Sequence, residues 1–196
     1  MIVGDRSHFA IESDVSVSYE RKSFRALGFF VIYLQGRLYG VKRPEATMMA
    51  ASFDNIADRI ASRGRHTAPF AAEPSAANLA KAFRDAVYAP QDVSRSFFGM
   101  SCAAFSRFFG SHGVLLAPDG DEAFDDGSYI LQFDVDDMVR LIGFKCTQGE
   151  PHDAGSLTDL WMPSAEYYSV LQRWRDGFFA EWTAAEKTPE NMDGAE

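Results

Sequence analysis

The chain has 196 residues, 46% of them hydrophobic, and a formal net charge of -9 at pH 7. A chain of this size buries about 70% of the surface that its unfolded form exposes, which is enough for one domain with its own core. The acidic balance argues against nucleic acid as a partner, because binding a phosphate backbone needs a basic surface.

No apolar run approaches the roughly 18 residues that a membrane span needs, and the start of the chain does not fit a secretory signal. We therefore expect a cytoplasmic protein without a membrane contact. The domain is predicted to cover residues 1–186, and the polar segment 187–196 is expected to be a disordered tail because it has little to bury. Cys102 and Cys146 lie in apolar stretches, which fits reduced, packed thiols.

The beginning of the chain predicts strands. Apolar residues occupy alternate positions from Phe9 to Val17, as in a strand with one wet face. Residues 28–42 then predict a hairpin whose turn is centred on Gln35-Gly36, because glycine supplies the positive φ that such a turn needs.

Two helices are predicted next. Apolar residues from Met49 to Ile60 recur at helical spacing and Gly64 follows as a stop signal, which predicts a helix of about four turns. Residues 67–74 are rich in Ala and Pro and predict a loop. Ser75 is then placed to cap a second helix.

The rest of the chain predicts a helix near 101–109, a strand at 113–116 and two further strands joined by a turn at Asp136-Asp137. From Pro163 onward, aromatic and aliphatic residues lie on one face of a long helix. This order predicts the α+β class: a single domain with a largely antiparallel β-sheet packed with several α-helices, including a long C-terminal helix.

A catalytic reading centres on Ser101. It lies in Gly99-Met-Ser101-Cys-Ala103, which is one glycine short of the nucleophile elbow G-x-S-x-G, and the chain has no HGGG-like oxyanion segment. A helix start with Ser101 as its cap is the preferred interpretation. The four histidines are scattered and no glycine-rich phosphate loop is present, so we predict no metal and no cofactor.

Four stretches carry a resemblance to a known family. They are Met1-Ile-Val-Gly-Asp5 with Phe9-Ala-Ile-Glu12, the hairpin from Gly28 to Gly40, the stretch from Asp126 to Lys145, and Leu157-Thr-Asp-Leu-Trp161-Met-Pro163 with Tyr167 to Trp174. In this order they resemble the immunity protein 42 family of bacterial polymorphic-toxin systems. The resemblance implies a small cytoplasmic protein that catalyses no reaction and that binds and neutralises one toxin domain, often the C-terminal domain of a contact-dependent inhibition effector.

The resemblance gives the acidic second half of the chain a role. Residues 99–196 hold 18 acidic and 6 basic residues, a balance that favours a basic protein partner. We therefore expect carboxylates of this half to pair with Lys and Arg of the cognate toxin domain. The expected contact residues are Asp119, Asp121, Glu122, Asp125, Asp126, Asp134, Asp136 and Asp137. The alternative is that the residues from 119 to 126 form a solvated loop that binds nothing.

The aromatic residues Tyr129, Trp161, Tyr167 and Trp174 have the regular spacing of core positions, although aromatic side chains also anchor partners. Two other classes of function stay open beside the immunity protein. One is a hydrolase that uses Ser101 or Cys102, and the other is a regulatory or binding module without a toxin partner. The sequence leaves the oligomeric state open.

Overall fold

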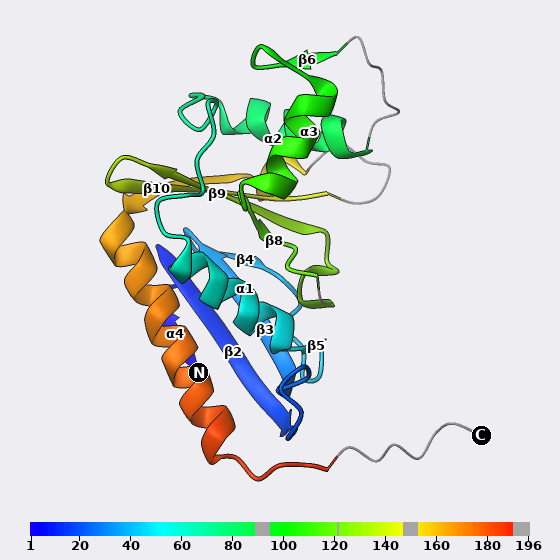
Figure 1. Cartoon of the computed structure of the whole chain (residues 1–196), viewed down its shortest axis with the longest axis vertical. Helices are drawn as coiled ribbons and strands as arrows, with labels where there is room; N and C mark the ends of the chain where they lie inside the picture. The colour runs from blue at the N-terminus through cyan, green and yellow to red at the C-terminus, as the bar shows by residue number, and fades with distance from the viewer. Residues whose placement is uncertain (89–94, 121, 147–152, 190–196) are drawn as a thin grey trace, which may run out of the picture.

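The computed structural model describes residues 1–88, 95–120, 122–146 and 153–189. Its antiparallel strands and long C-terminal helix confirm the predicted α+β class (Figure 1). The strands are β1 (Ile2–Gly4), β2 (Phe9–Ser18), β3 (Ala26–Leu34), β4 (Arg37–Tyr39), β5 (Thr47–Met48), β6 (Ser96–Phe97), β7 (Met100–Ser101), β8 (Leu115–Ala117), β9 (Ser128–Val135), β10 (Met138–Lys145) and β11 (Thr158–Pro163). The helices are α1 (Ala50–Ala61), α2 (Ala76–Tyr88), α3 (Cys102–Ser111) and α4 (Ser164–Ala184), with 3₁₀ turns η1 (Glu122–Phe124) and η2 (Ala154–Ser156).

The strands form two main sheets instead of the one that the sequence predicts. The first sheet has the order β1, β2, β3, β4, with β5 also paired to β3, and the second has the order β11, β10, β9, β8. Helices α1 and α4 contact each other, and α4 lies along β1 and β2 (Figure 1). Helices α2 and α3 pack together on the other side of the second sheet (Figure 1). The second sheet therefore lies between two layers.

Because it has a packed layer on each side, the second sheet buries both faces of β9. Leu131 and Phe133 point into the core that α2 and α3 cover. Ile130 points the other way, into the core shared with the first sheet, α1 and α4. Gln132 and Asp134 follow Ile130 on that second face and are also buried. Alternation of polar and apolar residues along this strand therefore does not mark a wet face.

Most of the predicted elements are present. The turn at Gln35-Gly36 joins β3 to β4 with φ angles of 49° and 81°, as expected of a two-residue hairpin turn. Ser75 caps α2, since its Oγ accepts a hydrogen bond from the Asn78 N–H at 3.2 Å. The sequence pattern does not predict β1 or β11. Pro163, predicted in the first helical turn, is the last residue of β11 and stands just before α4.

The predicted tail begins in contact with the domain. The Thr188 N–H donates to the Ser18 carbonyl at 2.7 Å. Thr188 also forms an isolated parallel β-bridge with Tyr19, the residue after Ser18. Residues 190–196 lie outside the described residues, so disorder of the tail stays a prediction.

Arg59 lies on the inner face of α1, where only 3% of it is exposed. Its Nη1 donates to the Gly113 carbonyl at 2.8 Å and to Oε1 of Gln132 at 2.9 Å. Its Nη2 donates to the Leu115 carbonyl, and Nε donates to Oδ1 of Asn55 at 3.2 Å. A buried charge is tolerated only where it is hydrogen-bonded, so these acceptors hold α1 against β8 and β9.

The same network continues into α4 through Gln132 and Asp134. The Tyr167 hydroxyl donates to Oε1 of Gln132 at 2.7 Å. The Tyr168 hydroxyl lies 3.0 Å from both carboxylate oxygens of Asp134 and donates to that group. Burial raises the pKa of both tyrosines, so both hydroxyls remain protonated and can donate. The network thus joins α1, the second sheet and α4.

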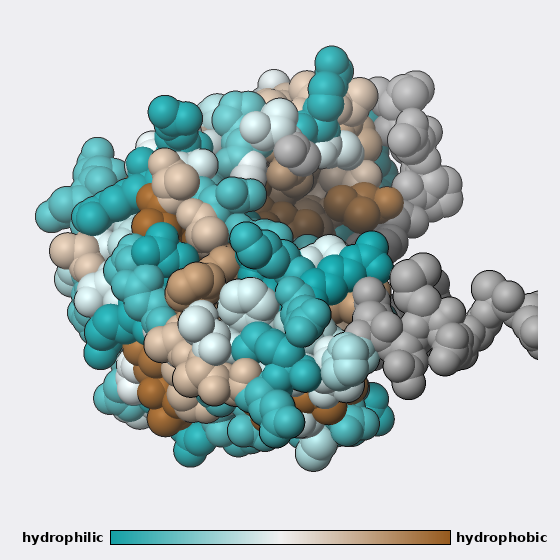
Figure 2. Space-filling model, turned by 60° about the horizontal axis from the view of Figure 1, so that its bottom comes forward, coloured by the Kyte–Doolittle hydropathy of each residue, from teal (hydrophilic) through white to brown (hydrophobic). Residues whose placement is uncertain are grey.

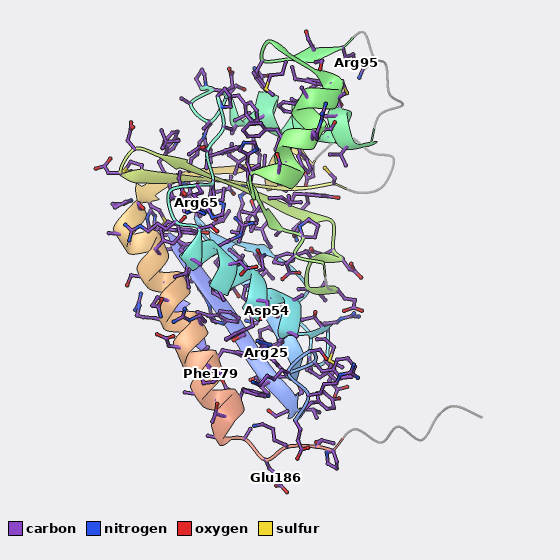
Figure 3. The ribbon with its side chains drawn as sticks, viewed as in Figure 1. Arg25, Asp54, Arg65, Arg95, Phe179 and Glu186 are labelled. Atoms are coloured by element: carbon purple, nitrogen blue, oxygen red, sulfur yellow. The ribbon has the colours of Figure 1, made fainter. Side chains whose placement is uncertain are left out.

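We expect Arg59→Met to lower the free energy of unfolding by about 3 kcal/mol, because it leaves several buried acceptors without a donor. Arg65→Met is the matched control, since the Arg65 side chain is exposed shortly after α1 (Figure 3), and its effect should stay within about 0.5 kcal/mol. Urea denaturation of both variants measures the difference. Equal midpoints would show that the guanidinium does not hold α1 in place.

Candidate functional site

Apart from Asp134, the predicted contact residues that the structure describes fall into two groups at opposite ends of β9. Asp136 and Asp137 form the exposed turn from β9 to β10, as predicted. Because β9 has eight residues, it spans about 26 Å, and the structure does not bring the two groups together. The group before the strand consists of Asp119, Glu122, Asp125 and Asp126, while Asp121 lies outside the described residues.

Asp134 belongs to neither group, because only 8% of it is exposed. Its Oδ2 accepts hydrogen bonds from the Gly64 N–H at 2.7 Å and from the His66 N–H at 3.2 Å. Together with the bond from Tyr168, these contacts join the segment after α1 to β9 and α4. The carboxylate therefore has an internal structural role and does not belong to a contact surface.

The loop that precedes β9 is held at both ends by its own carboxylates. The Ser52 hydroxyl of α1 donates to Oδ2 of Asp119 at 2.6 Å. Lys145, at the end of β10, donates to Oδ2 of Asp126 at 2.6 Å. Glu122 and Asp125 between these anchors are exposed. The loop thus presents carboxylates from a defined position beside α1.

A pocket of about 380 Å³ lies between the outer face of α1 and the chain that leaves β8. Three of its seven lining residues are aspartates, and none is basic. One asparagine and three apolar residues complete its wall. The lining residues are Ala51, Asp54, Asn55, Asp58, Leu115, Pro118 and Asp119.

Asp54 and Asp58 are the residues that the sequence prediction missed. They lie one turn apart on the polar side of α1, opposite the apolar positions that predict the helix. Arg25 donates to Oδ1 of Asp54 at 2.8 Å, and Figure 3 shows the two side chains next to each other. Asp58 is exposed. We call the following set the acidic surface: Asp54, Asp58, Asp119, Glu122, Asp125 and Asp126.

The core prediction is confirmed for Tyr167 and Trp174 and is wrong for Trp161, while Tyr129 is half-buried and packs against the core that α2 and α3 cover. Tyr167 and Trp174 are fully buried, as expected of core positions. Trp161 is 40% exposed, so its predicted place in the core is wrong. The reason is that β11 is the edge strand of the second sheet. The Arg140 guanidinium lies beside the Trp161 ring there, 5.1 Å from the ring centroid.

Hydrophilic residues predominate on the face in Figure 2, and apolar residues form smaller patches there.

Ser101 occupies the position that the non-catalytic interpretation predicts. It is the N-cap of α3, and its Oγ accepts from the Ala104 N–H at 3.3 Å. His112 follows the other end of the same ten-residue helix, about 15 Å away, and its ring stacks on Phe108. The structure therefore does not pair Ser101 with His112, and His152 lies outside the described residues.

Histidine, cysteine and carboxylate side chains could also form a metal site, and a long apolar helix could cross a membrane. Among the described residues, no group of three or more His, Cys, Asp or Glu side chains is arranged to hold a metal ion. Both cysteines are free. In the part of the chain that the structure describes, no helix has the length and apolar character needed to cross a membrane. The acidic surface is therefore the strongest candidate for a functional site.

Comparison with protein families decides the family. The profile of immunity protein 42 matches residues 1–177, which is most of the chain. The chain belongs to the immunity protein 42 family. This membership confirms the resemblance on which the contact residues were predicted, and it identifies an immunity protein.

Other comparisons add the fold of a second immunity protein. The crystal structure of CdiI from Burkholderia dolosa AUO158 matches with a TM-score of 0.56 and 15% sequence identity. The match covers 90% of this chain and 99% of that one. At such low identity it shows that the two proteins share a fold. A search of curated proteins finds no match.

We expect Asp119→Ala to lower the free energy of unfolding of this immunity protein by about 1–2 kcal/mol, because the buried Ser52 hydroxyl loses its acceptor. Asp125→Ala removes an exposed carboxylate of the same loop and should change stability by less than about 0.5 kcal/mol. Thermal or urea unfolding compares the two. Equal stability would mean that Ser52 does not anchor the loop, whereas the expected result makes Asp119 unsuitable for binding tests.

Proposed function

We propose that this immunity protein binds one cognate toxin domain in the cytoplasm and neutralises it without catalysing a reaction. The match of the immunity protein 42 profile to residues 1–177 is the observation that carries the proposal. The fold shared with a CdiI supports the C-terminal toxin domain of a contact-dependent inhibition effector as the partner.

The charge of the chain supports a partner with a basic surface. The formal net charge is -9, and the acidic surface combines carboxylates from α1 with those of the loop before β9. Complementary potential speeds the encounter of two proteins and disfavours wrong partners. A nuclease toxin fits this description, because its substrate cleft must attract a polyanion. In this proposal the acidic surface meets that cleft and competes with the substrate.

The pocket beside α1 suits one long basic side chain of the toxin. The alkyl stem of a Lys or Arg would pack on Leu115 and Pro118, as such stems commonly do on apolar surface. Its charged end would then reach the carboxylates of Asp54, Asp58 and Asp119. A basic side chain would therefore find opposite charge and apolar contact at the same position.

The turn at Asp136-Asp137 is the competing contact. The turn lies about 26 Å along β9 from the loop that contains Asp126. The acidic surface offers more carboxylates and a pocket, so we assign the principal contact to it. The turn then provides a comparison at the other end of the same strand.

Neutralising Asp54, Asp58, Glu122 and Asp125 together, to Asn and Gln, should weaken binding to the toxin domain by about 100-fold and reduce its salt dependence, because desolvated charge pairs are lost at the interface. None of the four is Asp119, which anchors the loop through Ser52. Titration calorimetry at low and high salt measures both effects, after urea denaturation has shown that the variant is folded.

The matched control is Asp136→Asn with Asp137→Asn, which should change the affinity less than about threefold. Asn tolerates the φ of 52° at position 136, so the turn is preserved. A strong effect of this control with none from the quadruple variant would move the contact to the turn. No effect of either would exclude an acidic contact while leaving the immunity function intact, whereas a wild-type protein that binds no toxin would contradict the function.

A further inference from the structure

His66 lies five residues beyond the end of α1, with only 5% of its surface exposed. Neither Nδ1 nor Nε2 has a hydrogen-bond partner. The ring packs against Gly113 so closely that a Cβ added there would lie 3.1 Å from Nδ1. A buried imidazole without partners is unusual, since buried polar groups are almost always hydrogen-bonded.

The groups that surround the ring come from several elements. Arg59 of α1 contributes a buried positive charge, and Asp134 of β9 contributes a negative one. The carbonyl groups of Arg59 and His112 also face the ring, without completing a hydrogen bond. On the side of α4, the Tyr168 hydroxyl binds Asp134, and the Arg63 guanidinium lies 5.1 Å from the Tyr168 ring centroid.

Asp134 is already engaged by other donors. Its Oδ2 accepts from the backbone N–H groups of Gly64 and His66, and Tyr168 donates to the same carboxylate. The Gln132 side-chain amide also donates to its Oδ1, at 3.3 Å. A proton on the His66 ring would place a second buried cation beside Arg59, with one carboxylate to balance both.

Burial lowers the pKa of His66, and the positive charge of Arg59 lowers it further. The unfolded chain therefore binds a proton at this residue more readily than the folded protein does. The contribution of neutral His66 to the free energy of unfolding is fully present above the unfolded pKa of about 6.5. It is lost as the pH drops from there toward the lower pKa of the folded protein.

We propose that His66 is a pH-sensitive switch. When the ring is protonated it leaves its buried site, so the segment 62–66 separates from β9 and α1 packs less tightly on β8. The backbone bonds of Gly64 and His66 to Asp134 tie the ring's position to that segment. Arg59 ties the same region to the Gly113 and Leu115 carbonyls. Residues of α1 and Leu115 line the pocket beside α1, so low pH would change the shape of that pocket as well.

Hydrogen exchange of the free protein tests this at about pH 7.5 and about pH 5.5, on either side of the ordinary histidine pKa. After correction for intrinsic exchange, protection of the Gly64 and His66 amides should fall by up to about tenfold at the lower pH, the most that one histidine can contribute, and by more than protection of β2 and β3. His66→Phe, which keeps a ring but cannot titrate, should remove this drop. His112→Gln is the control, because His112 is exposed, and should retain it.

An acid-induced drop that persists in His66→Phe would overturn the proposal. If that variant does not fold, nuclear magnetic resonance of the wild-type protein replaces it. The His66 ring and the Gly64 amide should then shift with one common midpoint below pH 6.5. A ring that titrates while the Gly64 amide stays unchanged would equally overturn the switch.

Discussion

The buried guanidinium of Arg59 is the constraint on which the arrangement of the domain depends. Its charge is removed from water, so its N–H groups must find acceptors within the fold. The acceptors at Gly113 and Gln132 are 54 and 73 residues away along the chain. Arg140 repeats the solution on the other face of the second sheet, where it donates to the Ala71 and Glu73 carbonyls as well as to Asp159. Both arginines connect segments that apolar packing alone would not place in register.

Much of the secondary structure can be predicted because turns, caps and apolar stripes depend on residues that are close together in the sequence. The turn at Gln35-Gly36, the apolar stripe of α4 and the cap at Ser75 each depend on neighbouring residues. The interior position of Asp134 could not be predicted, because its partners are backbone groups of 64 and 66 and a hydroxyl from α4. An aspartate that alternates with apolar residues along a strand normally indicates a solvent-exposed face. Here that face is buried, because a second layer packs on the sheet.

The candidate site shows the same division between local and distant information. The acidic loop was visible in the composition of residues 119–126, but the pocket was not. Asp54 and Asp58 were on the predicted polar side of a helix, and nothing in the local sequence indicates that Pro118 lies beside them. The core prediction for Trp161 is wrong for a related reason. Its exposure follows from the edge position of β11, and the order of strands in a sheet cannot be predicted from one local segment.

These features suit a protein whose function is to present a fixed surface. The interior network holds α1 in place, and α1 presents its aspartates next to the loop that Ser52 anchors. The most direct measurement is calorimetric titration of the wild-type protein with the toxin domain encoded by the neighbouring gene, at two salt concentrations. We expect a 1:1 complex of about nanomolar affinity or tighter that weakens as salt is added. Two folded partners that form no complex would contradict it.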